Sequence, residues 1–186
     1  MERIIIDMDE VIADLRVAVG ITRFDPMGEM VSWYEKNYGQ KVDYDQMKEG
    51  SWVRGFPEEH RKLVLDRLHS EGFFRNLPVM DDAQEVLKEM NKGYEIFIVS
   101  AAVEFPNSLK DKHDWLLEHF PFFTWKQLVL CGDKRMINGD YMIDDHVRNL
   151  IHFPGKKLLY SAFHNREIQG YDRLNNWKEA GEMFLK

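Results

Sequence analysis

Two aspartates, Asp7 and Asp9, directly follow a run of three isoleucines near the start of the chain. This apolar, β-branched run predicts a short buried strand of a parallel sheet. Alternate side chains of an extended chain share a face, so both carboxylates can face one site beyond the end of the strand. Ligands bind at that edge of open α/β sheets, and carboxylate oxygens suit Mg²⁺, so the spacing predicts a cation site. The alternative interpretation is a pair of solvated acids at a strand-to-helix turn, one of them an N-cap.

Further polar groups fall at the ends of later predicted strands. Taken singly, each has a plain structural explanation as a turn residue, a solvated lysine or a helix cap. Because the carboxyl ends of parallel strands lie at one edge of a sheet, we expect these groups to converge with Asp7 and Asp9. They are Ser100 at the end of 94–100, Lys134 beyond 127–130, and Asp144 with Asp145 after 140–143.

This set of side chains suits phosphoryl transfer. The Asp7 carboxylate can attack phosphorus to form an aspartyl-phosphate, while Asp9 protonates the leaving oxygen and later activates water. A Mg²⁺ ion held by Asp7 and Asp144 would screen the repulsion between nucleophile and phosphate. The Ser100 hydroxyl and the Lys134 ammonium would hold the remaining phosphate oxygens as charge builds up.

The elements that must position these groups alternate between strand and helix from residue 80 onward. Before that point, the chain from about residue 20 to 78 is polar, helical in character and rich in aromatics. We therefore predict an α/β fold: a Rossmann-like doubly wound parallel sheet of about five strands, with a small helical cap inserted after the first strand. The predicted core comprises 1–16 and 77–186 and the cap 17–76; helices are expected over 81–90, 108–120 and 175–185, a strand over 157–160, and a loop over 163–173.

Composition narrows the class of protein. A chain of 186 residues is one domain, or one domain with an insert, and 44% hydrophobic residues indicate a globular protein. A net charge of -7 argues against nucleic acid polymers or anionic membranes as partners. The single cysteine, Cys131, excludes an intramolecular disulfide and is expected to be buried. With no apolar run of about 18 residues and no signal-like start, we expect a cytoplasmic protein; a homodimer stays open.

The order of these motifs resembles the haloacid dehalogenase superfamily of phosphohydrolases. The motifs are residues 4–11, 98–100, Lys134 and 143–145. Within that superfamily the chain is most similar to the 5'(3')-deoxyribonucleotidases. The segments that carry this closer resemblance are the opening motif up to Asp14, residues 72–78 and 96–101, residues 128–130 followed by Asp133 and Lys134, and residues 142–145 and 163–165.

The resemblance implies a Mg²⁺-dependent phosphomonoesterase that removes phosphate from nucleoside monophosphates, with a small-molecule nucleotide as partner. It implies Asp7 as nucleophile and metal ligand, and Asp9 as acid and base with its backbone carbonyl on the metal. Asp144 would be the third protein ligand, supported by Asp145. The implied phosphate-binding residues are Ser100, Ala101 and Lys134, and the cap positions implied to contact the base are Leu15, Ser51, Trp52 and Phe74.

Four positions depart from the family pattern. Leu15 and Ser51 stand where the family tends to carry aromatics, Glu10 replaces a glycine, and His146 replaces an arginine. Two other functions stay open: a phosphatase of another small phosphate ester, and a catalytically silent ligand-binding module. The intact pair of aspartates counts against the silent module, and a carboxylate at Asp9 indicates an oxygen leaving group rather than a halide.

Overall fold

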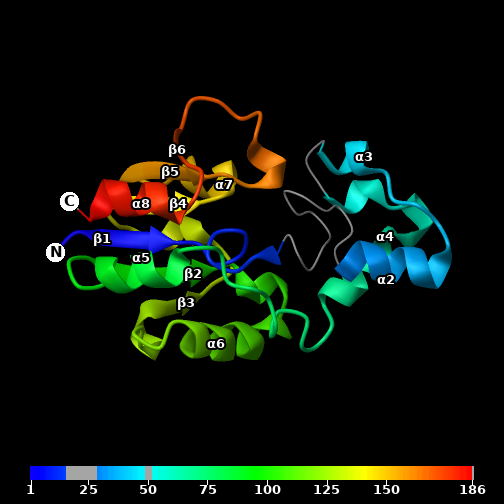
Figure 1. Ribbon diagram of the computed structural model, residues 1–186, viewed down its shortest axis with the longest axis horizontal. Coiled ribbons are helices and arrows are strands. Elements are labelled where there is room, and N and C mark those ends of the chain that lie inside the picture. Colours follow the sequence, from blue (N-terminus) through cyan, green and yellow to red (C-terminus); the bar gives the residue numbers. More distant parts are fainter. Residues whose placement is uncertain (16–28, 49–51, 186) are drawn as a thin grey trace.

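A six-stranded parallel sheet forms the core of the larger lobe of the molecule (Figure 1). The computed structural model describes residues 1–15, 29–48 and 52–185. The spatial order β3-β2-β1-β4-β5-β6 places β1 in the middle, and successive strands run outward from it in both directions. The chain therefore has the predicted doubly wound α/β fold. The strands are β1 Arg3–Ile6, β2 Glu95–Ser100, β3 Leu128–Leu130, β4 Tyr141–Asp144, β5 Lys156–Tyr160 and β6 Asp172–Leu174.

The isoleucine run forms the central strand because both faces of the sheet are covered. Ile4, Ile5 and Ile6 pair with β2 on one side and β4 on the other. Ile4 and Ile6 belong to one buried hydrophobic cluster, whereas Ile5 belongs to the cluster on the opposite face. The alternation of a strand thus buries every side chain of the run, as a parallel sheet requires.

Helices cover the two faces unequally. Side chains of α5 Ala83–Met90, α6 Ser108–His119 and α8 Trp177–Phe184 pack with Ile4 and Ile6, and α7 Val147–Leu150 packs on the other face. The indole nitrogens of buried Trp115 and Trp177 donate hydrogen bonds to the carbonyls of Leu77 (2.6 Å) and Val11 (2.8 Å). These bonds tie α6 and α8 to the segments that flank the end of β1, where the predicted site lies.

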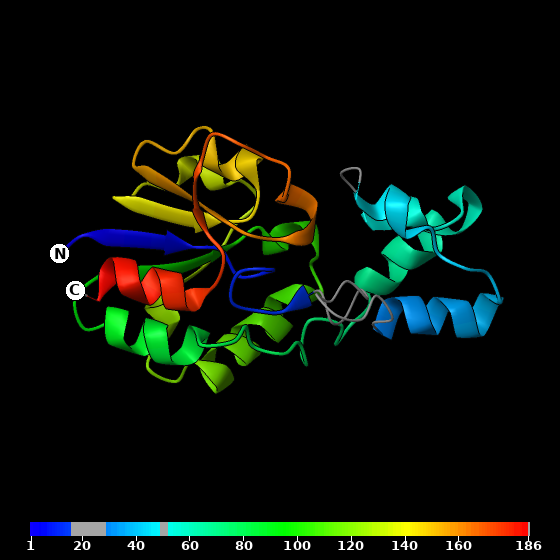
Figure 2. The ribbon, with the colours of Figure 1, turned by 45° about the horizontal axis from the view of Figure 1, so that its top comes forward.

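A second group of helices lies beyond the carboxyl ends of the strands (Figures 1 and 2). It comprises α2 Glu29–Tyr38, α3 Tyr44–Lys48, the 3-10 helix η1 Trp52–Gly55 and α4 Glu58–Leu68. These helices share a hydrophobic cluster of their own, which includes Met30, Tyr34, Met47, Phe56 and Val64. This is the position expected of a cap, although the boundary at 17–76 stays a prediction.

Three details differ from the sequence expectation. The predicted loop over 163–173 contains a 3-10 helix, η5 Phe163–Asn165, and its last two residues begin the sixth strand, β6. That strand has one buried residue and no apolar run, so pairing with β5 rather than its own composition defines it. The helix expected from residue 81 begins at Ala83, because Asp82 adopts a positive φ of 63° and makes no side-chain cap bond.

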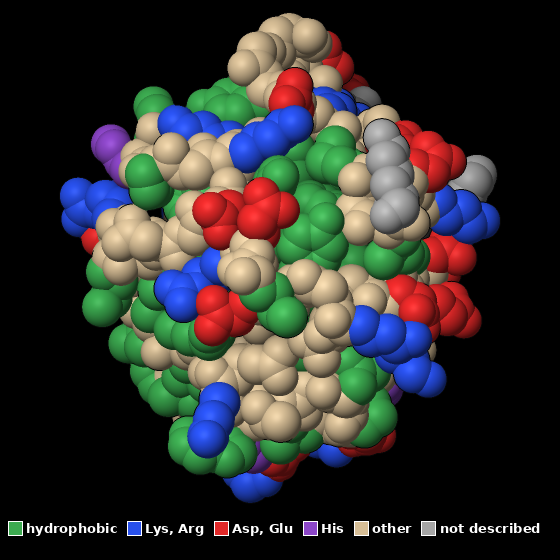
Figure 3. Space-filling view, turned by 90° about the vertical axis from the view of Figure 1, so that its left-hand side faces the viewer, with side chains coloured by type: hydrophobic (Ala, Val, Ile, Leu, Met, Phe, Trp, Pro, Cys, Tyr) green, Lys and Arg blue, Asp and Glu red, His purple; other side chains and the backbone are tan. Residues whose placement is uncertain are grey.

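The end of the molecule away from the cap carries both chain termini (Figure 1). Viewed from that side, charged side chains of both signs are interspersed with hydrophobic and other groups (Figure 3). Within the described ranges, no helix is both long and apolar enough to cross a membrane. The buried charged residues described below lie instead at the carboxyl edge of the sheet, toward the cap.

Candidate active site

Three carboxylates meet at the carboxyl edge of the sheet. Asp7 follows β1, Asp144 is the last residue of β4, and Asp145 comes directly after it. One oxygen from each lies within 4.8 Å of the others, and all three side chains are buried. The Asp7 amide donates to the carbonyl of Ile143 (2.9 Å), which holds the two strand ends in register. We call Asp7, Asp144 and Asp145 the acid cluster.

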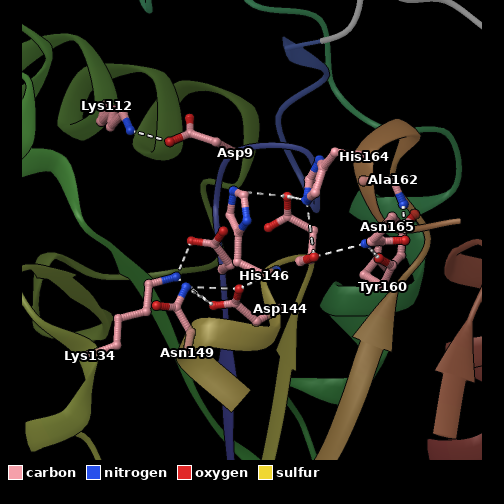
Figure 4. A network of polar contacts seen from close by, with 12 residues as sticks. Asp9, Lys112, Lys134, Asp144, His146, Asn149, Tyr160, Ala162, His164 and Asn165 are labelled. Atoms are coloured by element: carbon pink, nitrogen blue, oxygen red, sulfur yellow. Dashed lines mark hydrogen bonds and ion pairs between the residues drawn. The ribbon is translucent and has the colours of Figure 1, made fainter. Parts of the chain in front are cut away.

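Lys134 brings a positive charge into the acid cluster (Figure 4). Its Nζ donates to Asp7 and to Oδ2 of Asp144 (2.7 Å), and the side chain is buried. Burial alone would lower the pKa of this ammonium, but the Asp7 and Asp144 carboxylates outweigh it and raise the pKa above its ordinary value. Lys134 therefore stays charged and offsets part of the negative charge.

The acid cluster still holds more negative charge than its neighbours offset. Asp144 accepts from the His146 amide (2.8 Å) and from Asn149 Nδ2 (2.9 and 3.0 Å). In contrast, Oδ1 of Asp145 is buried without a hydrogen-bond partner among the described residues. Burial, then repulsion from Asp7 and Asp144, raises the pKa of Asp145. A buried set of hard oxygen donors with an unpaired oxygen fits a divalent cation such as Mg²⁺.

Asp9 lies apart from the acid cluster and has its own lysine. Its Oδ2 accepts from Nζ of Lys112, a buried side chain on α6 that also donates to Ser100 Oγ (3.0 Å). The same Nζ lies 4.5 Å from the centre of the Phe74 ring. The two aspartates of the opening motif are thus held by different cations, one lysine each, which gives them different surroundings.

Glu10 shows what the turn after Asp9 requires of the backbone. Its φ is 62°, in the left-handed region that glycine adopts without strain. The Glu10 amide donates to the carbonyl of Ala13 (2.9 Å), and this tight turn leads the chain away from the sheet. The geometry gives a physical reason for the glycine that the resemblance places at this position.

A pocket opens between the acid cluster and the cap. Asp7, Asp9, Lys134 and Asp145 line its polar side, together with Ala101. Its apolar side includes two of the four cap positions that the resemblance implicates, Leu15 and Phe74, with Leu68 and Phe105 beside them. Phe74 is only 2% exposed and packs against Phe73 and Phe105, so it is also a core residue.

The other predicted site residues are placed as follows. Ser51 lies outside the described residues, and Trp52 begins η1, where its backbone alone is described. Ser100 is 1% exposed and lies at the end of β2, with its hydroxyl against Lys112. The structure thus brings together Asp7, Lys134, Asp144 and Asp145, and it places Asp9 and Ser100 around a second lysine.

Sequence reasoning missed Lys112 and Arg148, which both line the pocket. Lys112 had a detectable signal, because with Ser108 and Trp115 it falls on the buried face of α6, an unusual place for a lysine. Arg148 is exposed in α7 and puts a cation on the pocket wall two residues after His146, where the resemblance had suggested a lost arginine.

His164 was also missed as a site residue. Its ring stacks on that of His146 at 4.3 Å between centroids, beside Asp145. Burial is the main cause that lowers the pKa of both imidazoles, that of His146 to about 4. Both rings are therefore neutral at pH 7, and they add no fixed charge to the acid cluster.

Comparison of the fold with solved structures supports a haloacid dehalogenase-like class. A haloacid dehalogenase-like protein from Agrobacterium tumefaciens superposes with a TM-score of 0.61, covering 100% of this chain and 98% of that one. At 12% identity this similarity concerns the fold alone. The parallel sheet and the helices inserted after its first strand thus define a haloacid dehalogenase-like α/β fold.

Sequence comparison identifies the family. The model of the family "5' nucleotidase, deoxy (Pyrimidine), cytosolic type C protein" matches residues 2–186, and the chain belongs to this family of phosphoric monoester hydrolases. A 5'(3')-deoxyribonucleotidase of Bacillus subtilis strain 168 is 38% identical over 192 residues, covering 100% of both chains. A 5'(3')-deoxyribonucleotidase of Bacillus phage SPbeta gives the same values.

Proposed function

We propose that this chain is a Mg²⁺-dependent phosphomonoesterase that hydrolyses deoxyribonucleoside monophosphates through an aspartyl-phosphate on Asp7. The observation that carries the proposal is the pairing of a buried acid cluster with Lys134, beside a second acid, Asp9, held separately by Lys112. The family and the names of the relatives supply the substrate class.

The proposed reaction has two steps that mirror each other. In the first, an Asp7 oxygen bonds to phosphorus, the ester P–O bond breaks, and Asp9 gives its proton to the leaving oxygen. In the second, water attacks phosphorus, Asp9 takes the proton from that water, and the bond between Asp7 and phosphorus breaks. Inorganic phosphate leaves, and both aspartates return to their starting state.

The basic and polar groups around Asp7 have complementary roles. Lys134 reaches Asp7 directly, so its ammonium can also contact the oxygens of a phosphate that lies against that carboxylate. We assign phosphate binding to Lys134, to Ser100 and to Ala101, which lines the same pocket. Asp7, Asp144 and the backbone carbonyl of Asp9 would hold Mg²⁺, with Asp145 in support; the ion would neutralise charge on the phosphate.

The pocket wall supports an organic leaving group with a flat ring. Leu15, Phe74 and Phe105 contribute apolar surface to the lining of the pocket, and the predicted cap positions Ser51 and Trp52 belong to the segment that precedes α4 in the sequence. A nucleobase combines an apolar face with polar edges, so it suits a pocket of this kind.

Phosphate release from a substrate panel tests the function. The panel contains 5'- and 3'-monophosphates of deoxy- and ribonucleosides and several sugar phosphates, each with Mg²⁺ and with EDTA. We expect metal-dependent release that favours deoxynucleotides. Metal-dependent release from sugar phosphates alone would contradict the nucleotide assignment but keep the chemistry of Asp7. No release from any ester would contradict the enzymatic proposal.

A further inference from the structure

Asn149 holds the Asp144 carboxylate of the acid cluster by both of its oxygens. The Nδ2 atom of Asn149 lies 2.9 Å from Oδ1 and 3.0 Å from Oδ2 of Asp144 (Figure 4). The amine is the half of the amide that faces the carboxylate, because the amide oxygen would be repelled by it. The proposed phosphatase reaction gives Asn149 no role, so this contact needs an explanation of its own.

The two nearly equal distances place Nδ2 between the carboxylate oxygens. A donor that makes a hydrogen bond to each oxygen at the same length lies on the side of the carboxylate away from its carbon. A cation that binds a carboxylate through both oxygens lies in the same position. Asn149 therefore occupies the bidentate position of Asp144.

The other acceptor positions of the buried Asp144 carboxylate are also in use. The His146 amide donates to Oδ1 (2.8 Å), and Nζ of Lys134 donates to Oδ2 (2.7 Å). A carboxylate offers about four acceptor positions, and these two donors with the two contacts of Asn149 fill them. A cation that replaces Lys134 or the His146 amide gains one oxygen, whereas bidentate binding requires Asn149 to leave.

The backbone around Asn149 is anchored on both sides. Its amide donates to the carbonyl of His146 (3.0 Å), within the turn that leads from β4 into α7. The next residue, Leu150, is fully buried and packs in the cluster that includes Ile5 and Met142. Such supporting contacts are what orients the residues around a metal ligand.

Open space lies beside the amide. Asn149 lines the pocket next to the acid cluster and also a neighbouring cavity of about 370 Å³, and Lys134 and Arg148 line both as well. One water takes up about 30 Å³ of liquid volume, so this cavity has room for several. Loss of the amide would therefore open the bidentate position of Asp144 to space in which a larger cation can keep its waters.

We propose that Asn149 sets the cation preference of the acid cluster, because it restricts Asp144 to one oxygen and so favours Mg²⁺ over Ca²⁺. Mg²⁺ requires a near-ideal octahedron with bonds of about 2.0–2.1 Å, in which a single carboxylate oxygen fills one corner. Ca²⁺ takes roughly six to eight oxygens at about 2.3–2.6 Å and often binds a carboxylate through both. Asn149 is thus a positioning residue that acts through Asp144. The inference rests on the proposed Mg²⁺-dependent function and adds a residue that selects the metal.

Cation binding by the full chain tests the proposal without measuring turnover. Calorimetry gives Kd for Mg²⁺ and for Ca²⁺ in the wild-type protein, Asn149→Ala and Asn149→Leu. Alanine empties the position between the two oxygens, whereas leucine has nearly the shape of asparagine and fills it without donating. The matched control is Asn107→Ala, because Asn107 is an exposed asparagine that donates to the carbonyl of His69 (2.9 Å). Circular dichroism in EDTA confirms that the variants are folded.

In Asn149→Ala we expect Mg²⁺ to bind about 10-fold more weakly, and Ca²⁺ at least as tightly as in the wild-type protein. The ratio of the two Kd values therefore shifts by about 10-fold or more toward Ca²⁺. In Asn149→Leu both affinities should fall while their ratio is retained, since the bidentate position stays filled. Asn107→Ala should bind both cations like the wild-type protein.

Equal losses for the two cations in Asn149→Ala would overturn the proposal, because Asn149 would then support the site without selecting the metal. The same shift of the ratio in Asn149→Leu would also overturn it, since filling the position would then have no effect. Phosphate release by the wild-type protein with Mg²⁺, measured alongside, separates these outcomes from a failure of the proposed function. Wild-type protein that binds no Mg²⁺ would overturn both.

Discussion

At the scale of single residues, the site separates two acids that are neighbours in sequence. Asp7 contacts Lys134 within the acid cluster, whereas Asp9 contacts Lys112 on α6. If the Asp7 and Asp9 carboxylates shared one environment, they would compete for the same positive charge. Because they lie in different surroundings, the two acids can differ in role, one as nucleophile and the other as acid and base.

Asp7→Asn tests the nucleophile. The amide keeps the size of the side chain but cannot form the acyl phosphate, so turnover should fall by roughly 10⁴-fold or more while folding is retained. Activity is measured as phosphate release, and folding by circular dichroism. The control is Asp66→Asn, since Asp66 is an exposed acid of α4 that pairs with Lys62. Substantial residual turnover in Asp7→Asn would contradict the covalent route.

Lys112→Met tests whether this lysine positions Asp9. A nucleotide has a basic leaving oxygen that needs a proton, whereas p-nitrophenyl phosphate does not. We therefore expect about a 10²-fold loss of kcat/KM, which reports the first step and not the later attack of water, on nucleotides and a much smaller loss of kcat/KM on the aryl ester. Lys112→Arg should restore part of the activity. The control is Lys110→Met, an exposed neighbour on α6 paired with Asp114. Equal losses on both substrates would mean that Lys112 is structural.

The residues that sequence analysis found share one property. Asp7, Ser100, Lys134 and Asp144 lie at or just beyond strand ends, and a parallel sheet brings all such ends to one edge. Lys112 lies on helix α6 and His164 lies on the connecting segment η5. The rule that strand ends share one edge of the sheet therefore does not locate them. The contact between Lys112 and Asp9 spans 103 positions in the chain and depends on how α6 packs.

At the scale of elements, η5 connects the cap, the sheet and the acid cluster. Phe163 packs against the hydrophobic cluster of the cap, His164 contacts Asp145, and Asn165 bonds to the ends of both β4 and β5. Within this segment a single buried amide side chain satisfies several backbone groups. The segment η5 thus places a contact with the cap and a contact with the acid cluster on two adjacent residues, Phe163 and His164.

Asn165→Ala tests how much that amide contributes to the stability of the fold. The substitution leaves the carbonyls of Asp145 and Tyr160 and the Ala162 amide without their partner in a buried place. We expect a loss of about 2–4 kcal/mol in the free energy of unfolding, measured with urea. The exposed Asn37, which bonds to the carbonyl of Trp33, provides the control, with a change within about 0.5 kcal/mol for Asn37→Ala. Similar losses in both variants would contradict this account of η5.

Strands were predicted correctly where their hydrophobic pattern is strong. The prediction failed for the strand that is defined only by its pairing with a neighbouring strand. The run Ile4 to Ile6 and the stretch from Ile96 to Val99 are apolar enough to identify buried strands. Strand β6 is Asp172–Leu174, two charged residues and a leucine, and it exists because β5 offers a free edge beside it. Local sequence carries no signal for a strand of that kind.

At the scale of the whole molecule, the acid cluster is a local excess of negative charge in a chain whose net charge is -7. Binding of Mg²⁺ to the folded form should therefore raise thermal stability relative to EDTA. At a concentration roughly 100-fold above Kd, the gain is about 2.7 kcal/mol. For a chain of this size that corresponds to a rise in Tm of roughly 5–10 °C.

Differential scanning calorimetry measures this effect, with KCl at matched ionic strength as the control for screening. Asp144→Asn should remove most of the rise, because it removes one of the proposed ligands. If the wild-type Tm were the same in Mg²⁺ and in EDTA, or if Asp144→Asn showed the same rise as the wild-type protein, the assignment of the acid cluster as a cation site would be contradicted.

The most direct test of the central claim is to trap phosphate on Asp7. The protein is mixed with a deoxynucleoside monophosphate and Mg²⁺, quenched within one turnover, and treated with borohydride, which reduces an aspartyl-phosphate to homoserine. Mass spectrometry of the peptide that contains Asp7 then locates the product. We expect homoserine at position 7 and an unchanged Asp9. Turnover without any modification at Asp7, or with modification at Asp9 instead, would contradict the central claim.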